Sequence, residues 1–169
     1  MRLGVLVAVL TLFAACSSGG DGPDAVDETK SEMDQLVGEL LPDLAEAGNG
    51  EFPRVQGMFL NCQLGHTRLK YDVDGEVHGT RPAESAVGAM ATVAEEHGFD
   101  VVEGPADLTF VAEAGEVTLR VEAYDRPVGG KTVSVVTLDT DCTDFTSEAA
   151  DRALSLPTEV YGAPLRPQG

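Results

Sequence analysis

The stretch from residue 117 to residue 139, VTLRVEAYDRPVGGKTVSVVTLD, decides the fold class because apolar and polar residues alternate on both sides of a turn. Successive side chains of a β-strand point to opposite faces, so this alternation is typical of a half-buried strand. Gly129 and Gly130 tolerate the positive φ angles that a tight turn requires. The pattern predicts two antiparallel strands, Val117 to Tyr124 and Thr132 to Asp139.

Shorter segments with the same alternation precede this stretch. Asp100 to Val102 and Leu108 to Ala112 extend it into an antiparallel meander. Further upstream, Leu64 to Val73 and Glu76 to Thr80 flank Asp74-Gly75, a dipeptide that suits a two-residue hairpin turn. We therefore expect a first β-hairpin there, and a sheet of about five to six strands in total.

Two stretches have helical periodicity instead. The apolar residues of the first recur at intervals of three and four: Val26, Met33, Leu36, Val37, Leu40, Leu41 and Leu44. Pro42 and Gly48 indicate where this helix ends. The second helix opens at Arg81-Pro82 and stops at Gly98. We expect an α+β fold, in which an antiparallel sheet packs against two helices as a two-layer sandwich with one disulfide.

The amino terminus has the features of an export signal. Arg2 supplies a positive charge, and Leu3 to Ala15 is an apolar run of about thirteen residues, too short to span a bilayer. The run ends in Phe13-Ala14-Ala15-Cys16, which resembles a lipobox, although Phe13 stands where Leu or Val is usual. This resemblance implies that the thiol of Cys16 carries lipid, palmitate included. The alternative is an ordinary signal peptide with Cys16 incidental.

The expected organisation follows from these features. Residues 1–15 are a lipoprotein signal peptide, and residues 16–24 are a lipidated tether rich in glycine and serine. Residues 25–156 form a single extracytoplasmic α+β domain with a short additional helix near Ser147 to Leu154. Residues 157–169 form a proline-rich tail.

Charge and composition limit the partners and the source. The chain has 11 basic and 29 acidic residues, so removing Arg2 with the signal leaves 10 against 29, a net charge of −19. Such a charge repels nucleic acid and anionic lipid headgroups, so we expect no nucleic-acid partner. Isoleucine is absent and lysine and asparagine are scarce, which indicates a high-GC bacterial genome. The predicted location is the extracytoplasmic face of the cell membrane.

Two cysteines remain once Cys16 is acylated. Cys62 and Cys142 are an even pair in an oxidising compartment, which predicts a disulfide between them. The alternative is a zinc site made of both cysteines and a histidine, since His66 lies close to Cys62. No paired Cys-x-x-Cys supports that alternative.

The order of elements resembles that of LppA-like actinobacterial lipoproteins. The likeness spans roughly Cys62 to Asp144 and rests on a helix ending in Glu95-Glu96-His97-Gly98-Phe99, then strands, then 132-TVSVVT-137 before Cys142. Members of that family are small cell-envelope lipoproteins without an assigned reaction. The resemblance therefore implies a location and a two-cysteine domain, not a mechanism.

No catalytic motif is present in the sequence. Gly129-Gly130-Lys131-Thr132 ends like a phosphate-binding loop, but the first glycine of that motif is replaced by Asp125 and a strand follows. The three histidines, His66, His78 and His97, fit no catalytic pattern. We therefore predict no catalytic residue and no cofactor.

Two acidic clusters are the remaining candidates for a site. Asp72-Val73-Asp74-Gly75-Glu76 and the segment Asp139 to Asp144 offer oxygen ligands of the kind that calcium prefers. The first fails as a calcium loop because Lys70 and Arg81 occupy its outer ligand positions. A hairpin turn and a solvated strand end are the simpler interpretations, so we predict no metal site.

These features predict a non-enzymatic binding or protein-interaction domain, anchored to the lipid bilayer through Cys16. Its partner would be an envelope protein or a small-molecule ligand. The alternative is an extracytoplasmic enzyme whose site is assembled from residues distant in sequence. A cleft with a perturbed acid and base would favour the enzyme, and a shallow groove on the sheet would favour binding.

Overall fold

The computed structural model describes residues 22–62, 66–106 and 108–162 of the chain. In order, its elements are α1 (Pro23–Ala47), β1 (Gly50–Glu51), β2 (Val55–Asn61), β3 (Arg68–Gly79), α2 (Ala83–Glu96), β4 (Asp100–Ala106), β5 (Thr109–Ala114), β6 (Val117–Ala123), β7 (Thr132–Thr140), β8 (Thr143–Asp144), α3 (Ser147–Ser155) and β9 (Glu159–Tyr161). Cys16 and its lipobox lie outside the described residues, as does Leu64.

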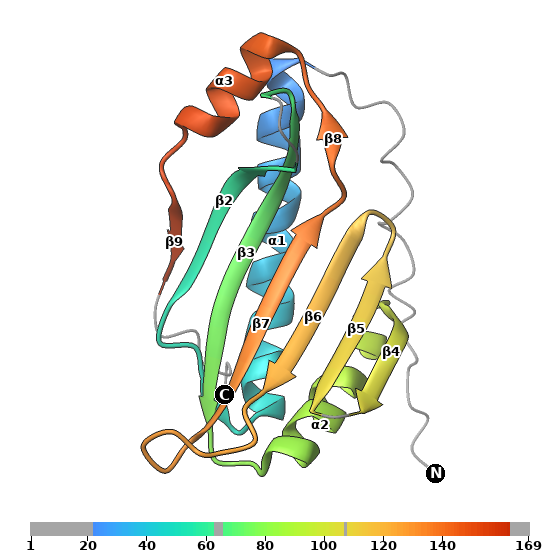
Figure 1. Ribbon diagram of the computed structural model, residues 1–169, viewed down its shortest axis with the longest axis vertical. Coiled ribbons are helices and arrows are strands. Elements are labelled where there is room, and N and C mark those ends of the chain that lie inside the picture. The colour runs from blue at the N-terminus through green and yellow to red at the C-terminus, as the bar shows by residue number, and fades with distance from the viewer. Residues whose placement is uncertain (1–21, 63–65, 107, 163–169) are drawn as a thin grey trace, which may run out of the picture.

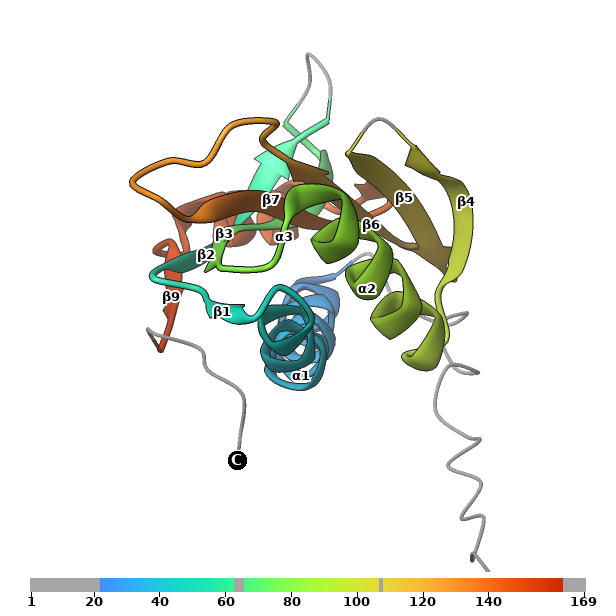
Figure 2. The same cartoon turned by 90° about the horizontal axis from the view of Figure 1, so that it is seen from below.

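One antiparallel sheet organises these elements. Its strands follow the order β4-β5-β6-β7-β3-β2-β9, and the short strands β1 and β8 pair with β3. Helices α1 and α2 cover one face of the sheet, and α3 packs against α1 at one end (Figures 1 and 2). The predicted α+β class is therefore confirmed. The expected five to six strands were too few, since the described residues form nine strands, whereas the two predicted long helices and the predicted short helix are all present.

Helix α1 follows the predicted apolar stripe. All seven predicted positions are buried, and the helix extends from Pro23, inside the predicted tether, to Ala47. Pro42 lies within the helix and does not end it. The end comes at Gly48, whose N–H donates to the Leu44 carbonyl at 3.0 Å. Among the described residues, no helix is both long enough and apolar enough to cross a membrane.

The predicted hairpin at Asp74-Gly75 is wrong. β3 continues through this dipeptide between two antiparallel neighbours, β7 and β2, and we did not predict β2 as a strand. Gly75 is needed here for close packing: a Cβ at this position would lie 2.9 Å from Phe52 Cδ1 and 3.0 Å from Val55 Cγ2. The absence of a side chain thus lets Phe52 and Val55 pack directly on the strand.

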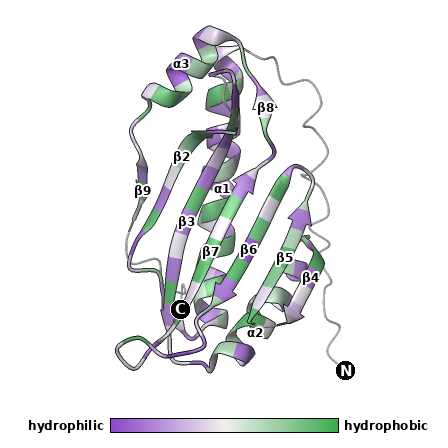
Figure 3. Cartoon of the chain, in the orientation of Figure 1, coloured by the Kyte–Doolittle hydropathy of each residue, from purple (hydrophilic) through white to green (hydrophobic). Residues whose placement is uncertain are grey.

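The predicted meander is present as β4 to β7. Gly115 turns the chain between β5 and β6 with φ of 59°, and Gly129 and Gly130 turn it before β7 with φ of 61° and 81°. Apolar and polar residues alternate most regularly along β6 (Figure 3). Leu119 and Leu138 are opposite each other in the register and fully buried, so the apolar set faces the helices.

The carboxyl-terminal elements return to the β2 edge of the sheet. α3 corresponds to the predicted short helix, and the Thr146 hydroxyl caps it by accepting a hydrogen bond from the Ala149 N–H at 3.2 Å. Residues 159–161 of the predicted tail form β9, which pairs with β2. β2 is therefore an edge strand only beyond Gly57.

Candidate binding surface

The face of the sheet opposite the helices carries the acidic residues of the first predicted cluster. Because side chains alternate along β3, Leu69, Tyr71, Val73 and Val77 enter the core. The residues between them point to the other face: Lys70, Asp72, Asp74, Glu76 and His78. We call this uncovered side of β2, β3, β7 and β6 the open face.

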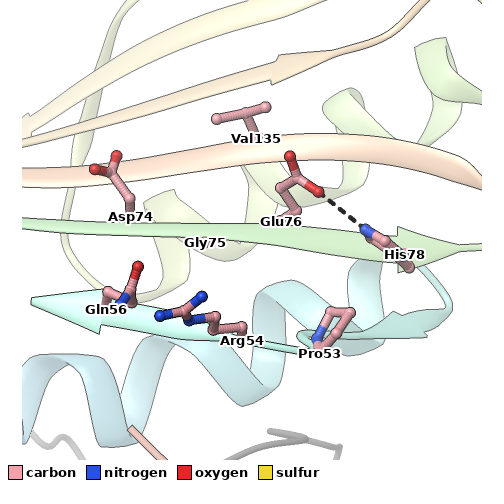
Figure 4. Close-up of a pocket in the computed structure, with 8 residues that line it drawn as sticks. All are labelled: Pro53, Arg54, Gln56, Asp74, Gly75, Glu76, His78 and Val135. Carbon is pink, nitrogen blue, oxygen red and sulfur yellow. Dashed lines mark hydrogen bonds and ion pairs between the residues drawn. The ribbon is translucent and has the colours of Figure 1, made fainter. Parts of the chain in front are cut away.

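A hollow of about 390 Å³ lies on the open face. It is lined by Pro53, Arg54, Gln56, Asp74, Gly75, Glu76, His78 and Val135. Figure 4 shows Arg54 and Gln56 on the β2 side and Asp74, Glu76 and His78 along β3. His78 Nε2 lies 3.0 Å from Glu76 Oε2, so these two side chains partner each other. The lining is charged with both signs, which favours a polar or charged ligand over an apolar one.

A cluster of charges adjoins the hollow. Lys70 Nζ lies 3.2 Å from Asp72 Oδ1 on its own strand and 3.2 Å from Asp139 Oδ1 on β7. Asp72 and Asp139 are opposite each other in the register, so one ammonium group bridges both carboxylates. Thr137 Oγ1 donates to Asp74 Oδ1 at 3.0 Å on the same face.

Burial makes the carboxyl group of Asp72 an unusually weak acid. Only 7 % of this residue is exposed, and this burial, together with the neighbouring Asp74 carboxylate, raises the pKa of Asp72 to about 6 against the opposing effect of Lys70. Burial alone would lower the pKa of Lys70, but its hydrogen bonds to Asp72 and Asp139 outweigh this effect and raise it. Lys70 therefore stays charged, while Asp72 changes charge near neutral pH.

The two predicted acidic clusters thus meet, although no calcium-type loop results. Asp72, Asp74 and Glu76 share the open face of β3, and Asp139 joins them through Lys70. Asp141 is exposed beyond β7. Within the ranges that the structure describes, no three His, Cys, Asp or Glu side chains are grouped so as to hold a metal ion.

Cys62 and Cys142 form the predicted disulfide, with Cα atoms 6.1 Å apart. Cys62 follows β2, and Cys142 lies between β7 and β8, so the bond joins two loops at the end of the sheet near α3. With both sulfur atoms in this bond, no thiolate is left for the zinc alternative. His66 lies exposed in the connection between β2 and β3.

The other residues considered for catalysis have structural surroundings. His97 caps α2, and its Nε2 lies 2.8 Å from Asp43 Oδ2 on α1. Gly129-Gly130 form a turn closed by backbone hydrogen bonds between Val128 and Lys131, and a strand follows. The turn interpretation of Gly129-Gly130-Lys131-Thr132 is therefore confirmed.

One polar network was missed from the sequence. The Tyr161 hydroxyl donates to Asp34 Oδ1 at 2.6 Å and lies 3.2 Å from the Tyr71 hydroxyl. Lys30 Nζ lies 2.6 Å from Asp34 Oδ2 and 3.3 Å from Glu159 Oε2. The alternation of Glu159 and Tyr161 with Val160 could have indicated a short strand, but the flanking prolines made this segment resemble a tail.

Comparisons with known proteins add no further constraint. Neither the models of known protein families, nor curated protein sequences, nor solved structures give a significant match to the chain.

Proposed function

We propose that this protein is a lipid-anchored lipoprotein on the extracytoplasmic face of the cell membrane, and that its domain binds a protein or a small molecule without catalysing a reaction. The observation that carries the binding role is the open face. The helices pack on the other side of the sheet, and the open face holds a hollow whose charged side chains are available to a ligand.

The distance between the anchor and the fold favours this arrangement. Cys16 precedes Pro23 by 23 − 16 = 7 residues, which span at most about 25 Å of extended chain. Lipid on Cys16 would therefore hold the start of α1 close to the bilayer. Since α1 has 25 residues and a length of roughly 37 Å, its far end, beside β1, would point away from the membrane. The hollow, which includes Pro53 and Arg54 after β1, lies toward that outer end.

The family proposal rests on the sequence. We infer an LppA-like actinobacterial lipoprotein from the order of elements between Cys62 and Asp144 and from a composition typical of a high-GC genome. The disulfide is consistent with an oxidising, extracytoplasmic compartment.

The binding role is tested by photocrosslinking in intact cells. A photoreactive benzoylphenylalanine replaces Val135 in the hollow, and a matched control places it at Glu39, which is exposed on α1. We expect a discrete adduct, seen as one defined mass increase of the protein, from the Val135 position and none from Glu39. The same set of adducts at both positions, or no adduct at either, would contradict a binding site on the open face.

An extracytoplasmic enzyme is the second candidate. The observation in its favour is Asp72, whose pKa of about 6 suits proton transfer near neutral pH. However, Asp72 is almost completely buried and its carboxylate contacts Lys70, so a substrate would have to displace this ion pair. A positioned partner acid or base would also be required, whereas His78 contacts Glu76. These contacts favour binding over catalysis.

A further inference from the structure

We propose that the surface on which β9 lies recognises an extended segment of a partner protein with the pattern acidic-x-Tyr, and that β9 occupies this surface in its absence. This inference rests on the proposed role as a binding domain and names its partner. The β9 contact surface consists of Lys30, Asp34, Gly57 and Tyr71, together with the backbone of residues 55–57.

The side chains of β9 are recognised in pairs with this surface. Glu159 and Tyr161 are two residues apart in a strand, so both point toward α1. Glu159 meets Lys30 at 3.3 Å, and the Tyr161 hydroxyl donates to Asp34 at 2.6 Å. Burial and the hydrogen bond to Asp34 raise the pKa of Tyr161, so its hydroxyl remains a donor.

A missing side chain makes room for the tyrosine. A Cβ on Gly57 would lie 2.7 Å from the Tyr71 hydroxyl and 3.0 Å from both Cε2 and the hydroxyl of Tyr161. Any larger residue at position 57 would therefore displace one of the two tyrosines. Glycine at this position gives the surface a shape that accepts an aromatic ring ending in a hydroxyl.

The backbone provides the sequence-independent part of recognition. β2 pairs with β9 at Val55↔Tyr161, Gln56↔Val160 and Gly57↔Glu159. An extended segment from another protein can form the same ladder, which is how strands are added at the edge of a sheet. Specificity then comes from the alternate side chains that face α1.

β9 is suited to exchange because little else holds it. It has three residues, none of them fully buried, and Val160 is 55 % exposed. The residues that recognise it belong to α1, β2 and β3, and β3 contacts both of the others. We therefore expect these elements to keep their packing when β9 leaves. A partner segment of the same pattern would form the same backbone ladder with β2 and the same ion pair with Lys30.

The test measures binding of a synthetic peptide to the full-length protein in zwitterionic detergent. The peptide has the sequence of residues 157–162, Pro-Thr-Glu-Val-Tyr-Gly, and carries a fluorophore for anisotropy. Tyr161→Ala weakens the internal competitor, so this variant should bind the peptide at least about tenfold more tightly than the wild type. A peptide with Phe for Tyr should bind about tenfold more weakly, because Asp34 then lacks its donor.

Variants of the surface itself give the matched controls. Adding Asp34→Ala to Tyr161→Ala should abolish binding, whereas adding Glu28→Ala, an exposed change on the same helix, should leave it unchanged. No saturable binding, or equal binding of the Tyr and Phe peptides, would overturn the proposal. A dimer of the wild type that Tyr161→Ala abolishes would assign the surface to a second copy of this chain and would also overturn it.

Hydrogen exchange of the wild type keeps the proposal testable if the variant does not fold. We expect the amides that pair β9 with β2 to exchange faster than those that pair β2 with β3. Equal protection of the amides in both ladders would contradict the replacement of β9 by a partner segment. These outcomes are separate from the role of the open face, since Val135 lies on β7, outside the β9 contact surface, and adducts there can form whether or not the peptide binds.

Discussion

Along β3, odd-numbered and even-numbered residues have opposite environments. Leu69, Tyr71 and Val73 are at most 2 % exposed beneath the helices, where apolar packing surrounds them. Lys70 and Asp72 face away from the helices, and the ammonium group of Lys70 forms ion pairs with Asp72 and with Asp139. The comparison shows that the covered side of this strand contributes apolar side chains to the core, whereas its other side carries the polar groups that can contact a ligand. Stability and ligand binding should therefore respond to different residues.

The largest expected difference between the two faces comes from neighbouring residues of β7. Leu138 is fully buried between Leu119 and Val73, so Leu138→Ala should lower the free energy of unfolding by about 2 to 5 kcal/mol. Thr137 lies on the open face and hydrogen-bonds Asp74, so Thr137→Ala should cost about 1 kcal/mol or less. Urea unfolding of both variants with the disulfide intact measures the difference. Equal destabilisation would show that the open face is also packed.

A smaller effect should appear as pH dependence on the open face. The folded pKa of Asp72 is about 6 against an ordinary 3.8, so between these values the folded state binds more protons than the unfolded state. Stability from this group therefore falls as the pH rises from about 4 to about 6. Asp72→Asn cannot ionise, so relative to wild type it should gain roughly 1 to 3 kcal/mol between pH 4 and pH 7.

Urea unfolding at several pH values in that window measures this gain. Asp125→Asn, on the exposed loop between β6 and β7, is the matched control for changing an acid to an amide. A constant difference between Asp72→Asn and wild type across the window would contradict a raised pKa for Asp72.

The parts of the fold that follow from local pattern were predictable. β6 alternates over its whole length, β7 alternates apart from the adjacent Val135 and Val136, and the stripe of α1 repeats at helical spacing, so burial on one side leaves a clear signal. β2 was missed because Met58, Phe59 and Leu60 form an apolar run without alternation. Gly75 was misinterpreted because a glycine needed for packing and one needed for a turn look alike in sequence.

The candidate sites depend on pairing between distant strands, which sequence does not give. Both acidic clusters were recognised, but only the register of β3 with β7 puts Lys70 between Asp72 and Asp139. Likewise, only the pairing of β9 with β2 brings Tyr161 to Asp34, more than a hundred residues away. The disulfide was predictable because export would leave Cys62 and Cys142 as a single pair.

The central claim, that lipid on Cys16 anchors the domain outside the cell membrane, is tested most directly by labelling cells with radioactive palmitate. The wild type and Phe13→Leu, which restores a usual lipobox residue, should both incorporate label and remain with the membranes. Cys16→Ala should incorporate none and leave the membrane fraction. Equal labelling of Cys16→Ala and wild type would contradict the lipid anchor.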